Sequence, residues 1–505
     1  MYRSAEELTS AAKDIYQKLS QLASQVKLTD REAENGAIET TPILTSSELK
    51  LADVLYANYS KWSRIVVAFL RRCSEHVAED FEESSRQLES YFRFQRYGTD
   101  IDHSTWKSVF FYESGQIIAR QLEIIKDNSD EFSWSHERAN NFSDLDLDFS
   151  RNGSSYSLEA RSPLGTSSSL MSIPFDDRDI ENFVLKHCSP RGAVRRVVPA
   201  NLEPFTRFGG ELFTSLIVDE VRDLYNSVRA HAQASNSGIR IRLRHSKAPE
   251  LSRIPWEFIF DGTDFLCLDS KVTLVRHLDS RQVPPPLELD LPLRILVTVS
   301  SPDDLSSLDV SLEVERLKKA LDPYIEMGLI ELSFTRDGEI STLQRILSSA
   351  ERARRPFHIW HFIGHGFFDE VQTMGYLAFE AGNSSRRVSG FELATLFRNY
   401  GSLRLIVLNA CETGMSDDIN TMSGIAGSLV ERSTSTVVAM QFPISDGAAI
   451  TFASEFYSSI ASGAPADASL VDARRAIFFA PNHSEWATPV LFTRSPSCEV
   501  FAVRP

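Results

Sequence analysis

The chain has 505 residues, of which 42% are hydrophobic and 24% are charged, and its formal net charge is -16 at pH 7. This length exceeds what one hydrophobic core normally supports, so we expect more than one domain. The negative charge, without a long run of Lys or Arg, argues against direct nucleic-acid binding. The composition is typical of globular proteins rather than of fibrous or disordered chains.

The N-terminus, MYRSAEELTSAAKD, lacks a basic start followed by an apolar stretch, so no secretory signal is predicted. The longest apolar run in the N-terminal half, residues 65–70, is far shorter than the ~20 residues of a membrane-spanning helix. The cysteines are scattered singly, which is typical of a reducing compartment. We therefore expect a cytoplasmic protein without a membrane span. The five cysteines are Cys73, Cys188, Cys267, Cys411 and Cys498.

Apolar residues recur every three or four positions over residues 5–27, which predicts a helix. Thr45 and Glu48 have the spacing of a capping box in front of a second helix, and residues 107–126 have a helical pattern too. We expect residues 1–127 to form a helical domain that packs on itself or on a partner. No motif in it indicates chemistry.

Residues 128–190 are polar and rich in serine. Such a segment offers little apolar area to offset the entropy lost when a chain becomes ordered. We predict a linker or mobile segment here.

A smaller α+β lobe is predicted over residues 191–286. An amphipathic helical pattern covers residues 209–232, and GIRIRLRH, residues 238–245, alternates apolar residues with arginine as in a half-exposed strand. Residues 271–278 have a second strand pattern, and three consecutive prolines at 284–286 end the lobe with a stiff connection.

Strand and helix patterns alternate strictly over residues 287–505. Such alternation with short joints predicts an α/β fold, a doubly wound and mostly parallel sheet with helices on both faces. Ligands of these folds bind at the carboxyl ends of the strands. The expected strands cover residues 293–301, 329–335, 356–366, 403–414 and 436–446.

Two of these strands are expected to end in reactive side chains, His365 within FIGHG and Cys411 within LNACETG. A thiol has an ordinary pKa of about 8.5, so it needs a base to become a nucleophile near pH 7, and an imidazole serves as that base. Glycines next to both residues leave room for a substrate and free backbone amides. The N–H groups of Gly366 and Cys411 are our candidate oxyanion donors.

Residues 200–505 resemble the CHAT domain, a family of caspase-like cysteine endopeptidases whose clan includes separase and metacaspases. The resemblance rests on FIGHG and LNACETG together with IPWEFIFD, VVAMQFPISD, DARRAI and EWATPVLF. It implies a caspase-like fold, a peptide bond as substrate and no cofactor. It also implies that His365 acts as general base and acid and that Cys411 is the nucleophile. In this family, regions such as residues 1–190 commonly couple the protease to a regulator or sensor.

Several side chains are candidates for the substrate pocket. Asp446 is placed to pair with a basic substrate side chain, or else to cap the helix that follows it. Asn409 shares a strand face with Cys411, and either lines the pocket or holds a neighbouring loop. Asp303 and Asp304 follow the first core strand, where ordinary turn residues look the same.

A metal site is not expected. His358 and His361 fall on opposite faces of a strand, and no cysteine or carboxylate completes a set with His365. We predict that His358 and His361 are hydrogen-bonded interior residues, and that Cys73 and Cys267 serve packing. Neither a serine-hydrolase motif nor a phosphate-binding glycine loop occurs.

The sequence thus predicts a regulated cysteine endopeptidase with a Cys411–His365 dyad that cleaves a protein substrate, in immunity or cell-death signalling. The alternative is a caspase-like adaptor that binds a peptide or partner without cutting it.

Overall fold

The computed structural model describes most of the chain from residue 142 onward and short stretches before it. The described ranges are 10–15, 17–18, 27–32, 38–43, 59, 62–63, 66, 81–86, 114–127, 142–188, 202–280, 283–306, 310–369, 374–412, 421–480 and 485–503. The chain divides into two compact units, which are Met1–Ser135 with Pro323–Gly328, and His136–Asp322 with Leu329–Pro505.

The first unit contains helix α5 (Ser114–Asp127), where a helix was predicted. Residues 10–15 are helical as well, but Lys27 begins a strand, and β1 (Lys27–Glu32) pairs antiparallel with β2 (Ile38–Ile43). This hairpin was not predicted. The predicted capping box at residues 45–48 lies outside the described residues.

A polar group lies within the apolar interior of the first unit. The Gln121 side chain is fully buried; its Nε2 donates to the hydroxyls of Ser84 and Ser85 at 3.1 and 3.0 Å, and its Oε1 accepts from the Tyr59 hydroxyl at 3.1 Å. Burial of an amide costs little when hydrogen bonds replace those to water, so this group fixes which faces of the helical segments meet.

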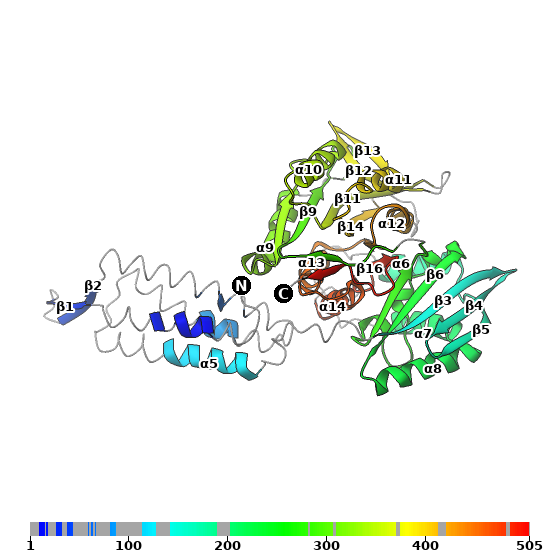
Figure 1. Cartoon of the computed structure of the whole chain (residues 1–505), viewed down its shortest axis with the longest axis horizontal. Coiled ribbons are helices and arrows are strands. Elements are labelled where there is room, and N and C mark those ends of the chain that lie inside the picture. Colours follow the sequence, from blue (N-terminus) through cyan, green and yellow to red (C-terminus); the bar gives the residue numbers. More distant parts are fainter. Residues whose placement is uncertain are drawn as a thin grey trace. The chain divides into compact units, whose positions relative to one another are not determined.

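Among the residues that the structure describes, the second unit is built on one sheet of thirteen strands (Figure 1). Its main path runs β10-β9-β11-β14-β15-β16-β7-β6-β3-β4-β5, and the hairpin β12–β13 extends from β11. The strands are β3 (Phe142–Asn152), β4 (Ser155–Ser162), β5 (Gly165–Met171), β6 (Gly238–Lys247), β7 (Val272–His277), β9 (Leu293–Val299), β10 (Ile330–Phe334), β11 (Ile359–Asp369), β12 (Met374–Ala381), β13 (Ser384–Ser389), β14 (Leu405–Glu412), β15 (Thr436–Met440) and β16 (Pro489–Thr493). A separate pair joins β8 (Leu287–Leu289) to β17 (Phe501–Val503) in parallel.

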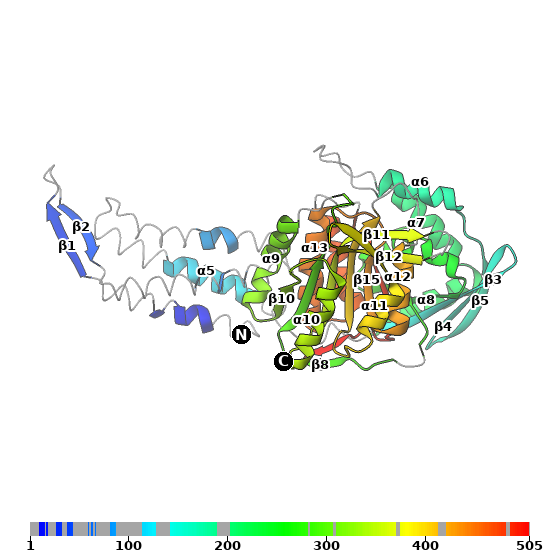
Figure 2. The same ribbon diagram turned by 90° about the horizontal axis from the view of Figure 1, so that it is seen from above.

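Helices cover both faces of the sheet, which Figure 2 shows edge-on. The helices from residue 177 onward are α6 (Asp177–His187), α7 (Glu203–Leu216), α8 (Asp219–Ala234), α9 (Val310–Glu326), α10 (Ile340–Arg352), α11 (Gly390–Phe397), α12 (Thr421–Arg432), α13 (Asp446–Ala461) and α14 (Ala466–Phe479). On one face, α10, α11 and α12 pack against Trp360, Phe362, Ile406 and Leu408 in one apolar cluster. On the other face, Tyr457 of α13 contacts His361.

The predicted fold class is confirmed. The core pairs β10–β9, β9–β11, β11–β14 and β14–β15 are all parallel, and β16 adds an antiparallel strand. The residues of these parallel strands are nearly all apolar, as expected for strands that are buried on both faces. The strand order changes direction between β9 and β11. From β9 the chain goes to β10 on one side, and the next core strands, β11, β14 and β15, follow on the other side of β9.

The predicted linker is contradicted over residues 142–188. β3, β4 and β5 form an antiparallel meander, β3 also pairs parallel with β6, and α6 follows. The sequence explains why β3 forms, because Leu145, Leu147 and Phe149 alternate with polar residues and are buried. Alternation with period two buries one face of a strand even where the other face is polar.

The expected accessory lobe and catalytic core share one continuous sheet, because β16 of the core pairs parallel with β7. The predicted half-exposed face of β6 is covered as well. Arg240 and Arg242 are only 5% and 7% exposed and are paired with Asp144, Asp146 and Asp467. Carboxylates on the neighbouring strand and on α14 make burial of these guanidinium groups possible.

The hairpin of β12 and β13 was also not predicted. It interrupts the strict alternation between β11 and α11, and its two-residue turn contains Gly382 at a φ of +62°. Glycine adopts this left-handed conformation without the strain that a Cβ would add. Among the described residues, no helix is both long enough and apolar enough to cross a membrane.

Candidate active site

The two predicted catalytic positions lie on adjacent strands. β11 and β14 pair in parallel, and the register places His365 opposite Cys411 and Gly366 opposite Glu412. Positions paired in register lie on the same face of a sheet, and neighbouring strands are about 4.8 Å apart. The site also lies beside the reversal of strand order between β9 and β11, where doubly wound folds bind their ligands. The side chains of Cys411 and Glu412 lie outside what the structure describes.

His365 does not end its strand, in contrast to the prediction. β11 continues to Asp369, because beyond the β14 pairing it pairs antiparallel with β12 from Gly366 to Asp369. The parallel part of the strand does end at Gly366, so His365 still lies where β11 and β14 part.

The imidazole of His365 is oriented by a backbone carbonyl. Its Nε2 lies 2.8 Å from the carbonyl oxygen of Ser306, in the loop that follows β9. A carbonyl oxygen only accepts, so Nε2 carries the proton and Nδ1 carries the lone pair in the neutral ring. Nδ1 is buried and accepts no hydrogen bond from any described residue.

The environment favours the neutral form of this histidine. Burial lowers the pKa of His365 below its ordinary value of 6.5, and the hydrogen bond to Ser306 partly opposes that shift. A neutral imidazole whose Nδ1 lone pair accepts no hydrogen bond can take up a proton and so act as a general base.

Glycine is required next to the histidine for steric reasons. A Cβ on Gly364 would lie 2.7 Å from Cζ of Phe362 and 3.1 Å from the carbonyl oxygen of Ser300. The loop that follows β9 therefore contacts β11 at two points. The carbonyl of Ser300 lies against Gly364, and the carbonyl of Ser306 accepts from His365. We expected Gly364 to make room for a substrate, whereas in the structure it makes room for the ring of Phe362 and for the backbone of Ser300.

The candidate pocket residues are distributed over three segments. Asp446 begins α13 and its Oδ2 pairs with Arg316 of α9 at 2.5 Å, while the helix cap is Ser445. Asp303 and Asp304 are exposed in the loop after β9, and Oδ2 of Asp304 accepts from the Ser385 hydroxyl at 2.9 Å. Asn409 is partly buried in β14, opposite Ile363. The capping alternative for Asp446 is thus contradicted.

The other two histidines of β11 are interior residues with hydrogen-bonding partners, as predicted. The His358 Nδ1 accepts from the backbone N–H of Arg294 at 3.1 Å, and the His361 Nδ1 lies 2.8 Å from the Tyr457 hydroxyl. Burial lowers the pKa of both to about 3, aided at His358 by the charge of Arg294. Within the described ranges, no three His, Cys, Asp or Glu side chains gather into a possible metal site.

Three of the remaining cysteines are buried free thiols. Burial raises the pKa of Cys188 and Cys498 strongly and that of Cys267 to about 11. Thiols of this kind are rarely ionised and react slowly. The packing role predicted for Cys267 agrees with its complete burial, while Cys73 lies outside the described residues.

Sequence reasoning missed Ser306. Its contact with His365 is made by the backbone carbonyl, which every residue type carries, so no sequence signal was available. The contact joins two segments 59 positions apart.

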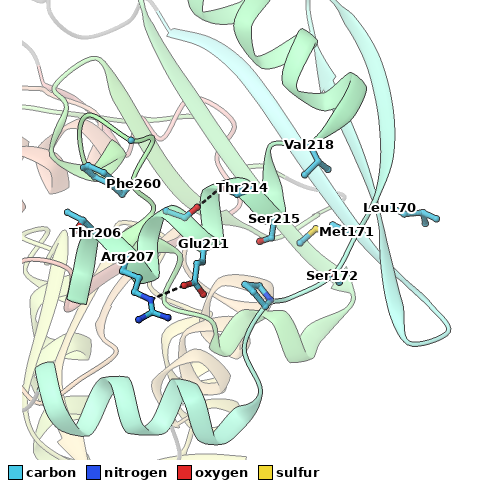
Figure 3. A pocket seen from close by; sticks show the side chains of 13 residues that line it. Leu170, Met171, Ser172, Thr206, Arg207, Glu211, Thr214, Ser215, Val218 and Phe260 are labelled. Atoms are coloured by element: carbon cyan, nitrogen blue, oxygen red, sulfur yellow. Dashed lines mark hydrogen bonds and ion pairs between the residues drawn. The ribbon is translucent and has the colours of Figure 1, made fainter. Parts of the chain in front are cut away.

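A cavity of about 680 Å³ lies elsewhere in the second unit, between α7 and the end of β5 (Figure 3). Its wall includes Leu170, Met171 and Phe260, and Arg207 and Glu211 of α7 pair with each other at its rim. Neither His365 nor any pocket candidate lines it. It therefore has no place in the chemistry proposed for Cys411.

The comparison with protein families identifies the chain. The family model described as CHAT domain matches residues 207–494, which is more than half of the chain. The chain belongs to this family, which comprises caspase-like proteases, and the resemblance found in the sequence is confirmed. No curated protein sequence matches the chain.

Among solved structures, two crystal structures of the Saccharomyces cerevisiae separase–securin complex are similar to the chain. Their TM-scores are 0.39 and 0.36, with sequence identities of 11% and 12%. Each comparison covers 96% of this chain and 40% of the matched chain, so this chain spans about two fifths of the matched chain's length.

Proposed function

We propose that the protein is a cysteine endopeptidase in which Cys411 is the nucleophile and His365 is the general base. The observation that carries the proposal is the register of β11 and β14, which pairs these two positions, together with the Ser306 carbonyl that leaves Nδ1 of His365 free. A spacing of about 4.8 Å between the strands is within the reach of an imidazole and a thiol.

The reaction follows from these two groups. Nδ1 of His365 takes the thiol proton, and the thiolate attacks the carbonyl carbon of the scissile peptide bond. The backbone N–H groups of Gly366 and Cys411 stabilise the oxyanion that forms. The imidazolium then returns its proton to the leaving amine as the C–N bond breaks, which leaves a thioester on Cys411. A water molecule, deprotonated by His365, hydrolyses the thioester and regenerates the thiol.

The substrate is a protein, and Asp446, Asn409, Asp303 and Asp304 are the proposed contacts to its side chains. Asp446 attracts a basic side chain only when that side chain displaces Arg316, because the two now form an ion pair. A regulator or sensor binds through the N-terminal unit and controls access to the site. Regulated proteolysis in the cytoplasm, in immunity or cell-death signalling, is the role that this organisation suits.

The proposal is tested by labelling and by cleavage. A peptidyl acyloxymethyl ketone probe, prepared with Arg, Asp or Leu next to the ketone, is incubated with the full chain, and the labelled cysteine is identified by mass spectrometry. We expect Cys411 alone to be labelled, and His365→Gln to slow labelling by at least about 100-fold. The matched control is His231→Gln on the exposed surface of α8, which should label like wild type.

Cleavage is then tested by incubating candidate proteins with wild type or Cys411→Ala and mapping the new N-termini. New termini that appear equally with both proteins would refute the assignment of Cys411. Binding of peptides without labelling or cleavage under any condition would favour the adaptor instead.

A further inference from the structure

The loop that supplies the Ser306 carbonyl is held by a hairpin that carries none of the proposed catalytic groups. This loop comprises residues 300–306 and is called the β9 loop here. It starts against β11, where the N–H of Ser300 donates to the carbonyl of Ile363 at 2.8 Å. It ends at Ser306, whose carbonyl accepts from His365.

Glu380 of β12 binds this loop and a second one at the same time. Its Oε1 accepts from the N–H of Ser301 at 3.0 Å, and its Oε2 accepts from the N–H of Gly338 at 2.9 Å. In addition, the N–H of Glu380 donates to the carbonyl of Gly338 at 2.9 Å. One carboxylate thereby joins the loops that follow β9 and β10, two adjacent strands of the core.

A second contact from the same hairpin holds the far end of the β9 loop. The hydroxyl of Ser385 in β13 donates to Oδ2 of Asp304 at 2.9 Å, two residues before Ser306. Glu380 and Ser385 are themselves partners in the β12–β13 register. The hairpin thus fixes the loop at Ser301 and again at Asp304.

The close approach of these segments leaves the loop little freedom. A Cβ on Gly338 would lie 2.7 Å from Cα of Ser300 and 2.8 Å from Cδ of Glu380. On its other side, Ser300 contacts the position of Gly364. The start of the β9 loop is therefore packed between two glycines, and the charge-assisted hydrogen bonds of Glu380 lie at that point.

We propose that Glu380 is a positioning residue that, through the β9 loop and the Ser306 carbonyl, sets the orientation of the His365 imidazole. This inference rests on the proposed function, since orientation of the ring matters only where His365 accepts a proton. The carboxylate is suited to the task because each of its two oxygens accepts from a different backbone amide, whereas glutamine would place a donor NH2 group against one of these N–H groups. Ser385 supports the same loop through Asp304.

The test compares Glu380→Gln with wild type in the rate of Cys411 labelling by the ketone probe. We expect the rate at saturating probe to fall by about 10- to 100-fold, because small errors of position in a reacting group have effects of this size. The probe concentration for half-saturation should stay within about twofold, since Glu380 does not contact the substrate. The matched control is Glu331→Gln on neighbouring β10, whose carboxylate pairs with Arg355 at the surface; it should label like wild type.

Ser385→Ala provides a second variant that removes an exposed contact and should preserve the fold. A single lost hydrogen bond of this kind corresponds to a decrease of about 2- to 10-fold. Should Glu380→Gln not fold, Glu380→Asp, whose shorter side chain cannot reach both backbone amides, carries the test, and a rate equal to that of wild type in a folded Glu380 variant would overturn the proposal.

A measurement that does not depend on enzymatic activity, the titration of His365, distinguishes the role of Glu380 from the proposed protease function. The titration of His365 is followed by NMR in protein labelled with ¹⁵N at histidine, with His365→Gln used to assign the signal. The Ser306 bond raises the pKa of His365, so Glu380→Gln should lower it further. An unchanged titration and labelling rate in folded Glu380→Gln would overturn the proposal. If wild-type Cys411 is never labelled, the protease assignment fails, and the NMR titration still decides whether Glu380 positions His365.

Discussion

Glu257 and Arg276 form an ion pair in the interior of the second unit, with 3.0 Å between Oε2 and Nη2 and both side chains at most 3% exposed. Glu257 belongs to the IPWEF segment, and Arg276 lies in β7. The Nε2 of Gln441, just after β15, also donates to Glu257 at 3.0 Å. This group of three side chains therefore joins the segment to the sheet on both sides of β16.

Replacement of Glu257 by glutamine should lower the free energy of unfolding by about 3 kcal/mol, because Arg276 would keep a buried charge without its counter-charge. Urea unfolding monitored by fluorescence measures the change. Glu331→Gln, which removes an exposed pair, should cost less than about 1 kcal/mol. Equal losses in the two variants would contradict the structural role of the buried pair.

Alanine at Gly338 should destabilise the protein by about 1–3 kcal/mol, because the new methyl group would meet the backbone of Ser300 at 2.7 Å. Gly210 is the matched control, since it lies within α7 and a Cβ there would meet no atom within 4 Å. Gly210→Ala should raise stability by about 0.5–1 kcal/mol, the usual gain in a helix. Thermal or urea unfolding of both variants checks the opposite signs.

Ser306→Ala should label at Cys411 at a rate within about twofold of wild type, because only the backbone carbonyl of Ser306 contacts His365. The measurement is the labelling rate with the ketone probe. A decrease of tenfold or more would show that the Ser306 hydroxyl has a role that its exposed position does not suggest.

Stability should fall as the pH falls from about 6.5 toward 3, in part because of His361. Burial lowers the pKa of this residue to about 3 in the folded protein, whereas an unfolded chain has a histidine pKa of about 6.5. The unfolded state therefore binds more protons in this range, and the residue lowers the free energy of unfolding by about 1.4 kcal/mol for each pH unit below 6.5.

Replacement of His361 by asparagine keeps a polar group near Tyr457 but removes the titration. Urea unfolding at pH 7, 6 and 5 should show a smaller loss of stability in this variant than in wild type. Above pH 7 the difference between the two proteins should be constant. Parallel losses down to pH 5 would mean that another group is responsible.

Local sequence patterns determined the five parallel core strands and the helices between them, though not the β12–β13 hairpin, and the position of His365 and Cys411 on two successive core strands. They succeed there because fully buried strands and amphipathic helices each have a period that residues a few positions apart reveal. The same patterns were misleading at residues 142–171. There the abundance of serine favoured a linker, although Leu145, Leu147 and Phe149 alternate with polar residues as in a strand and are buried.

Only the tertiary structure decided how His365 is held. The Ser306 carbonyl comes from the β9 loop, whereas the carboxylate of Glu380 and the hydroxyl of Ser385 come from the β12–β13 hairpin, far away in the sequence, and two of the contacts are made to backbone groups. Backbone amides and carbonyls are the same in every residue, so their partners are set by strand register and loop path rather than by residue type.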